Sequence, residues 1–123
     1  MDPFDPGMVV VSGFHATMTK QIARLPDRKW RKQEYRRFYN PMWGLFGDRT
    51  PGPPGTHHWQ SSTTSNQNWH IFDQVLLRPT LMDQLGDVQI LDHDGQRRLL
   101  DEKEMATKDH LSDHLPILFS LEL

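Results

Sequence analysis

The chain has 123 residues, of which 36% are hydrophobic and 24% charged, and its formal net charge is −2. This length predicts one small domain over residues 1–123. The balanced charge excludes a global attraction to nucleic acid, although local patches of positive charge could still bind it. The absence of cysteine excludes disulfide bonds and thiolate metal ligands, and the apolar runs are too short to span a bilayer.

The first 26 residues predict an irregular start followed by one helix. Prolines interrupt residues 1–7, and residues 8–11 fit either a short strand or a buried turn. Thr17 is a candidate N-cap, and Pro26 ends the apolar pattern that follows it. That pattern consists of Met18, Ile22 and Leu25. We therefore expect a core-facing helix between Thr17 and Pro26.

Residues 28–37 form a basic segment with aromatic residues interleaved. Its charged residues are Arg28, Lys29, Arg31, Lys32, Arg36 and Arg37, opposed by Glu34. The neighbouring aromatic residues are Trp30, Tyr35 and Phe38. Such a segment could contact a phosphate backbone and stack on bases. The alternative, which we favour, is a solvated helix face anchored by its aromatic residues.

Two strands are predicted in the middle of the chain, at residues 56–60 and 69–77. A loop rich in proline and glycine precedes them and a polar loop joins them, which indicates an antiparallel pair within one domain. His57 and His58 suggest a metal site, because imidazole is a common ligand. Successive side chains of a strand point to opposite faces, so these two cannot readily share one ion, and we do not expect a metal site there.

A hairpin is predicted around Asp94 and Gly95, between the apolar residues 88–91 and 99–100. Residues 92–95 also suggest a cation loop, but the later ligands of a calcium motif are missing. We therefore interpret this segment as a turn.

Two acidic positions predict a reactive site. Asp73 shares one face of its predicted strand with apolar residues, and a carboxylate in such a row needs a partner. Asp113 and His114 precede Pro116 and an alternating apolar run over residues 117–123, so they lie at the entrance of a last strand with one buried face. A histidine that donates a ring N–H is a natural partner for Asp73, and its pairing with His114 is a hypothesis.

These segments resemble a known family. Residues 112–116 read Ser-Asp-His-Leu-Pro, which resembles the closing Ser-Asp-His-x-Pro motif of the endonuclease/exonuclease/phosphatase superfamily. Residues 71–75 resemble the family's preceding strand, often written Ile-Asp-Tyr-Ile, whose acid orients the catalytic histidine. Residues 55–59 and 39–43 resemble segments of some bacterial members. The resemblance follows the order of the family's C-terminal half and spans most of the chain.

The sequence also departs from the family. It has no Gly-Asp-Phe-Asn loop, and residues 1–4 look like those immediately after that loop. The metal-binding Glu and the first Asn of the family's N-terminal half are absent as well. The resemblance therefore implies an α+β fold, the C-terminal half of a four-layered α/β sandwich with mainly antiparallel strands. The chain would supply mainly one sheet and its helix layer.

The resemblance implies a divalent-metal-dependent phosphodiesterase or phosphatase. Asp113 would serve the metal, His114 would contact the scissile phosphate or handle a proton, and Asp73 would hold His114 in its working tautomer. Carboxylate ligands without thiolates suit Mg²⁺ or Mn²⁺. The partners would be the missing N-terminal half of the domain and a phosphoester substrate, with nucleic acid among the candidates.

By this interpretation the isolated chain is inactive and binds the ion weakly. Two alternatives stay open. The chain could be a non-catalytic binding module that keeps the scaffold, or it could be a nonfunctional remnant.

Overall fold

The computed structural model describes residues 1–59, 67–106 and 112–123. Short helices and paired strands alternate along the chain in an α+β arrangement. In the first part the elements are α1 (Pro6–Val9), β1 (Ala16–Thr17), α2 (Lys20–Ala23), β2 (Arg28–Trp30), β3 (Gln33–Tyr35), β4 (Phe38–Tyr39) and the 3₁₀ helix η1 (Pro41–Leu45). The second part holds β5 (His57–His58), β6 (Trp69–His70), the 3₁₀ helix η2 (Met82–Gln84), β7 (Leu85–Ile90) and β8 (Ile117–Leu121).

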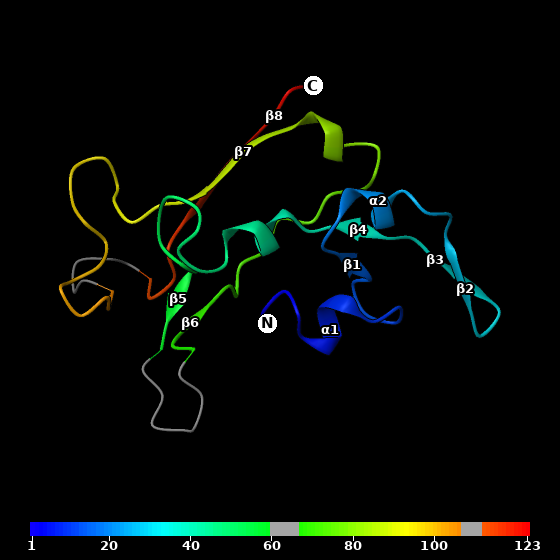
Figure 1. Cartoon of the computed structure of the whole chain (residues 1–123), viewed down its shortest axis with the longest axis horizontal. Helices are drawn as coiled ribbons and strands as arrows, with labels where there is room; N and C mark the ends of the chain where they lie inside the picture. Colours follow the sequence, from blue (N-terminus) through cyan, green and yellow to red (C-terminus); the bar gives the residue numbers. More distant parts are fainter. Residues whose placement is uncertain (60–66, 107–111) are drawn as a thin grey trace.

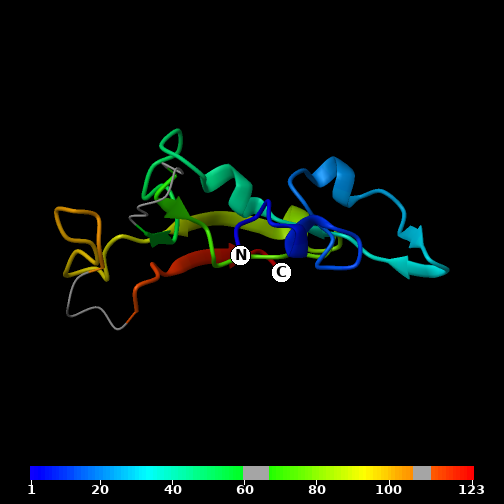
Figure 2. The same ribbon diagram turned by 90° about the horizontal axis from the view of Figure 1, so that it is seen from below.

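The strands form four pairs. Strands β2 and β3, β5 and β6, and β7 and β8 are antiparallel, whereas β1 and β4 are parallel. Figures 1 and 2 show an elongated arrangement with the β2–β3 hairpin protruding at one end and the loops around residues 93–106 at the other. The described residues therefore contain separate pairs rather than one sheet, and the four-layered sandwich stays a prediction.

The core gathers side chains from segments that are distant in sequence. Its fully buried members include Met42 in η1, Ile71 after β6 and Met82 in η2, and Leu115 packs against the same cluster. The predicted burial alternation over residues 69–77 is confirmed for its apolar members, because Trp69, Ile71, Val75 and Leu77 are all buried, whereas Asp73 on the same predicted face is partly exposed. The predicted continuous strand is wrong, since regular pairing stops at His70 and the chain bends at Asp73.

The predicted helix between Thr17 and Pro26 is only one turn long. It begins at Lys20, and Thr19 rather than Thr17 caps it, with its Oγ1 accepting from Ile22 N at 3.3 Å. The apolar residues that suggested a core-facing helix are exposed, with fractions of 52% for Met18, 44% for Ile22 and 52% for Leu25. Only Ala23 of this helix is buried, because a single turn presents too short a face for all of them.

Two other local predictions are wrong. The proline-rich start contains α1, where Pro6 occupies the first turn and so forfeits no helical hydrogen bond. The basic segment is the β2–β3 hairpin and not a helix. Its turn residues Arg31 and Lys32 have φ values of 48° and 64°, and two successive left-handed residues give the twist that joins antiparallel strands.

The C-terminal predictions are confirmed in part. Residues 92–98 form the expected turn, with a bridge between His93 and Arg98, but β7 pairs with β8 rather than with residues 99–100. The expected buried face of the last strand is incomplete, since Phe119 is 44% exposed and Leu123 is 94% exposed. Among the described residues β8 pairs with β7 alone, so the described structure places no second layer over Phe119. No described helix has the length and apolar character that crossing a membrane requires.

Candidate acid–histidine site

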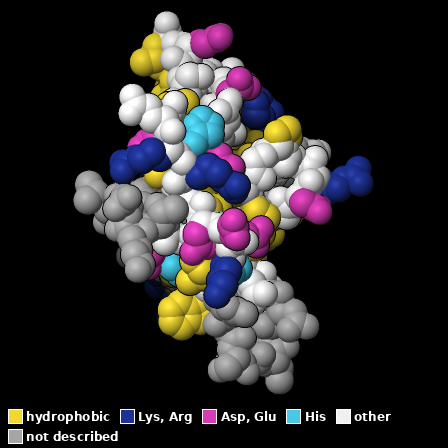
Figure 3. Space-filling view, turned by 90° about the vertical axis from the view of Figure 1, so that its left-hand side faces the viewer, with side chains coloured by type: hydrophobic (Ala, Val, Ile, Leu, Met, Phe, Trp, Pro, Cys, Tyr) yellow, Lys and Arg dark blue, Asp and Glu magenta, His cyan; other side chains and the backbone are white. Residues whose placement is uncertain are grey.

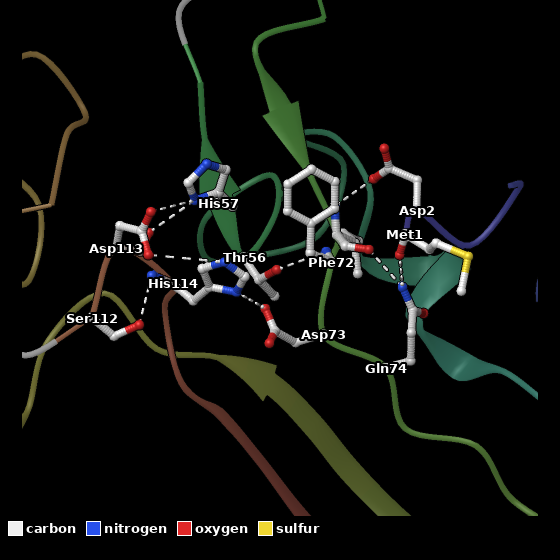
Figure 4. A network of polar contacts seen from close by, with 11 residues as sticks. Met1, Asp2, Thr56, His57, Phe72, Asp73, Gln74, Ser112, Asp113 and His114 are labelled. Atoms are coloured by element: carbon white, nitrogen blue, oxygen red, sulfur yellow. Dashed lines mark hydrogen bonds and ion pairs between the residues drawn. The ribbon is translucent and has the colours of Figure 1, made fainter.

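The central feature of the site is a hydrogen bond between Asp73 and His114. Their Oδ2 and Nδ1 atoms are 2.8 Å apart, and both side chains are partly exposed. An ionised carboxylate only accepts, so Nδ1 of His114 carries a proton in this contact. The structure thus brings together the two residues whose pairing the sequence left as a hypothesis, and Figure 4 shows Nε2 on the side of the ring away from Asp73.

Buried Thr56 joins the two segments that carry this pair. Its carbonyl accepts from Leu115 N at 2.7 Å, next to His114, and its Oγ1 accepts from Phe72 N at 3.0 Å, next to Asp73. Gly55 precedes it where a Cβ would lie 2.5 Å from the carbonyl oxygen of His70, so only glycine permits this approach. Sequence reasoning missed the role of Thr56, although it lies in one of the segments that resemble the family.

Asp113 lies beside the pair and is 74% exposed at its side chain. Its Oδ1 is 3.9 Å from His114 Nε2, and its Oδ2 is 3.8 Å from His57 Nδ1. Buried His57 makes a hydrogen bond of 3.1 Å to the backbone carbonyl of Asp113, and its ring centroid is 4.9 Å from that of His114. Donor atoms of these three residues all lie within 4.8 Å of one another, which makes a candidate metal-binding triad.

The sequence-based argument against a metal site at His57 and His58 was incomplete. The two rings do diverge, since His58 Nδ1 lies 3.2 Å from Met105 Sδ, outside the triad. However, His57 meets ligands from another part of the chain through an antiparallel bridge with His114. The local sequence around His57 could not reveal this partner, because bridge pairing between distant segments depends on the fold.

Asp2 and His70 form a second acid–histidine pair near the first. Asp2 is 4% exposed, and its carboxylate contacts His70 Nδ1 at 2.6 Å and accepts from Ile71 N at 2.7 Å. The ring of Phe72 separates the two pairs, with its centroid 4.7 Å from that of His70 and 6.0 Å from that of His114. Through these contacts Asp2 anchors the segment that leads to Asp73. Sequence reasoning did not single out Asp2.

The surface around the site is shallow and mixed in charge. A pocket of about 340 Å³ is lined by Asp73, Ser112, His114 and Pro116. A larger pocket of about 510 Å³ lies between residues 50–52 and 87–93, but none of the site residues lines it. Figure 3 shows acidic, basic and histidine side chains interleaved on this end of the molecule. The basic hairpin lies at the opposite end (Figure 1).

No family model matches the chain, and neither does any curated protein or solved structure. The resemblance to the endonuclease/exonuclease/phosphatase superfamily therefore rests on the sequence motifs and stays a prediction.

The triad does not by itself fit Mg²⁺. This ion prefers six oxygen ligands at near-ideal octahedral positions, whereas the triad offers one carboxylate and two imidazoles. A magnesium centre would need further oxygen ligands from outside this cluster.

Proposed function

We propose that the chain is the C-terminal part of a divalent-metal-dependent phosphodiesterase or phosphatase. The observation that carries this proposal is the 2.8 Å contact between Asp73 and His114, with Asp113 adjacent, in the motif order of the endonuclease/exonuclease/phosphatase superfamily. The complete domain would be a four-layered α/β sandwich. An N-terminal half would contribute the remaining site residues.

The chemistry proposed for the pair follows from its tautomer. Asp73 accepts the hydrogen bond from Nδ1 of His114, so Nε2 is the ring nitrogen that would accept a proton or contact a phosphate oxygen in the complete enzyme. Asp73 also stabilises the imidazolium that forms when Nε2 takes a proton. If the ion is Mg²⁺ or Mn²⁺, it needs oxygen ligands in addition to Asp113. Because the isolated chain lacks the N-terminal half that would supply them, we expect it to hydrolyse phosphoesters poorly.

The first test is to read the source DNA upstream of the codon for Met1 and to express any longer open frame. Hydrolysis of bis-(p-nitrophenyl) phosphate with Mg²⁺ or Mn²⁺ is then measured for the longer and the shorter chain. We expect Asp73→Asn and His114→Ala to lower the rate by about 10²- to 10⁴-fold, the usual contribution of acid–base catalysis. The matched control is His93→Ala, which removes an exposed histidine that also lies beside an acid, 4.0 Å from Asp92.

Rates like those of the wild type in both site variants would remove the assignment of the site. Full hydrolysis by the 123-residue chain alone would contradict the need for an N-terminal half. Loss of hydrolysis in the His93 variant as well would show that the assay reports folding rather than chemistry.

A second candidate function is nucleic-acid binding without hydrolysis, and the β2–β3 hairpin favours it. Arg31 lies over the ring of Trp30 at 4.4 Å, and Tyr35 packs at the edge of that ring with centroids 6.2 Å apart. The hairpin presents its charges on an exposed, protruding element (Figure 2). Phosphate contacts from the basic side chains and base stacking on the aromatic ones are the general means of binding single strands.

Fluorescence anisotropy with labelled single-stranded DNA tests this candidate at several salt concentrations. We expect Lys32→Gln to weaken binding and to lower the salt slope by about 1, the effect of one lost phosphate contact. The control is Arg97→Gln, which removes an exposed positive charge from the turn at residues 92–98. Equal binding by both variants, or binding that salt does not weaken, would exclude the hairpin as a nucleic-acid contact.

A further inference from the structure

We propose that His57, Asp113 and His114 bind a borderline transition-metal ion of the zinc type in preference to Mg²⁺. The binding of this ion goes beyond the proposed function, and an ion held by Nε2 of His114 would replace the proton-transfer role proposed for that nitrogen with the role of a metal ligand. The residue that decides the choice of ion is His57, which the resemblance leaves without a role.

The separations around Asp113 fit two ligands of one ion better than they fit hydrogen bonds. The 3.8 Å from Oδ2 to His57 Nδ1 and the 3.9 Å from Oδ1 to His114 Nε2 both exceed hydrogen-bond length. Two ligands with metal bonds of about 2.1 Å lie about 3.4 Å apart at a tetrahedral angle, slightly closer than these separations. The carboxylate therefore stands between the two rings at spacings that a shared ion would bridge.

Loading the site requires only a small movement. The ligand atoms all lie within 4.8 Å of one another, so closing them to the tetrahedral spacing of about 3.4 Å needs a shift of at most about 1.4 Å. Asp113 is well placed to move because most of its side chain is exposed. The rings are more firmly held, since buried His57 stacks on Phe72 with centroids 5.3 Å apart.

The surroundings of His114 already have the arrangement of a metal ligand. Its Nδ1 donates to Asp73, and this outer contact directs the Nε2 lone pair toward Asp113. A carboxylate that holds the far nitrogen of a ligating histidine is the common second partner in metal sites, because it fixes the ring and raises its basicity. Asp73 would thus act as a positioning residue for the ion.

His57 would change tautomer on binding. Its Nδ1 now donates to the carbonyl of Asp113 at 3.1 Å, and coordination through Nδ1 replaces that hydrogen bond while the ring proton moves to Nε2.

The donor set selects the ion. Two imidazoles and one carboxylate suit zinc-type ions and leave an open coordination position, whereas Mg²⁺ resists nitrogen ligands and retains its water. Without His57 the described residues offer one imidazole and one carboxylate, which is a weak site for either ion.

The test is calorimetric titration of the 123-residue chain with Zn²⁺ and with Mg²⁺, together with absorption spectra of the Co²⁺-loaded protein. The chain carries two adjacent histidines, so His58→Ala is a control for His57→Ala that removes the same group one residue away. We expect one Zn²⁺ per chain that excess Mg²⁺ does not displace. Affinity should fall about 10- to 100-fold in Asp73→Asn, at least as far in His57→Ala, and not at all in His58→Ala.

Several outcomes would overturn this inference. Equal affinities for Zn²⁺ and Mg²⁺, no stoichiometric binding, or wild-type binding by His57→Ala would each do so. Because His57 is buried, imidazole NMR signals of the wild-type protein provide a readout that does not depend on the folding of a variant. The signals of His57 and His114 should shift on adding Zn²⁺ while those of His58 should not, and the reverse pattern would exclude the site. Retained Zn²⁺ binding with failed hydrolysis would count against the proposed function alone.

Discussion

Replacing Asp2 tests how the start of the chain supports the site. In Asp2→Ala the buried Ile71 N–H loses its acceptor and His70 loses its charged partner. An unsatisfied buried donor costs about 1–3 kcal/mol, and a hydrogen bond to a charged group contributes about 1.5–3 kcal/mol. His70 is partly exposed and can turn to water, so we take the lower end of the second value and expect a loss of about 2.5–4.5 kcal/mol in the free energy of unfolding.

Asp2→Asn separates the two contacts. The amide oxygen can still accept from Ile71 N, so this variant should lose about half as much stability as Asp2→Ala. Asp87→Ala is the control, because it removes the same group from an exposed position in β7. Urea unfolding followed by tryptophan fluorescence gives the free energies, and hydrogen exchange of the Ile71 amide reports the contact directly.

The reasoning would be refuted if Asp2→Ala lay within about 0.5 kcal/mol of the wild type, the range of ordinary surface substitutions. It would also be refuted if the Ile71 amide stayed as protected in Asp2→Ala as in the wild type. Either result would mean that the short contacts of Asp2 do not hold the segment leading to Asp73.

Two further predictions concern stability. Met42→Ala, at a fully buried core position, should cost about 2–5 kcal/mol, whereas Ile22→Ala at an exposed position should cost far less, and thermal unfolding compares them. Burial, together with Arg37 and Arg28, lowers the pKa of His15 below its ordinary value of 6.5. Above pH 6.5 the ring is neutral in both states and the stability is fully present, and it should fall as the pH drops through the lowered pKa because the unfolded chain takes up the proton first. His15→Gln should flatten this dependence in urea titrations between pH 5 and pH 7, and an unchanged slope would contradict it.

Local sequence patterns predicted some elements well and others poorly. The alternation at residues 69–77 correctly predicted burial of Trp69, Ile71, Val75 and Leu77, although Asp73, expected on the same face, is 40% exposed at its side chain. The turn at residues 92–98 followed from Asp94 and Gly95, whose backbone preferences are intrinsic. The helix predictions failed because short amphipathic spacing does not reveal whether a core lies beside it. Met18, Ile22 and Leu25 have the spacing of a buried face, yet they are exposed.

By itself the sequence predicted that an acid and a histidine pair. It identified Asp73 as a carboxylate in need of a partner and His114 as a suitable one, because the cost of an unpaired charge and the donor capacity of imidazole are properties of the residues. Only the tertiary structure decided which groups meet. The hydrogen bonds of Thr56 bring residues 72 and 115 together, and the antiparallel bridge between His57 and His114 places His57 rather than His58 beside Asp113. Contacts between segments so far apart depend on how the whole chain packs, which no local pattern records.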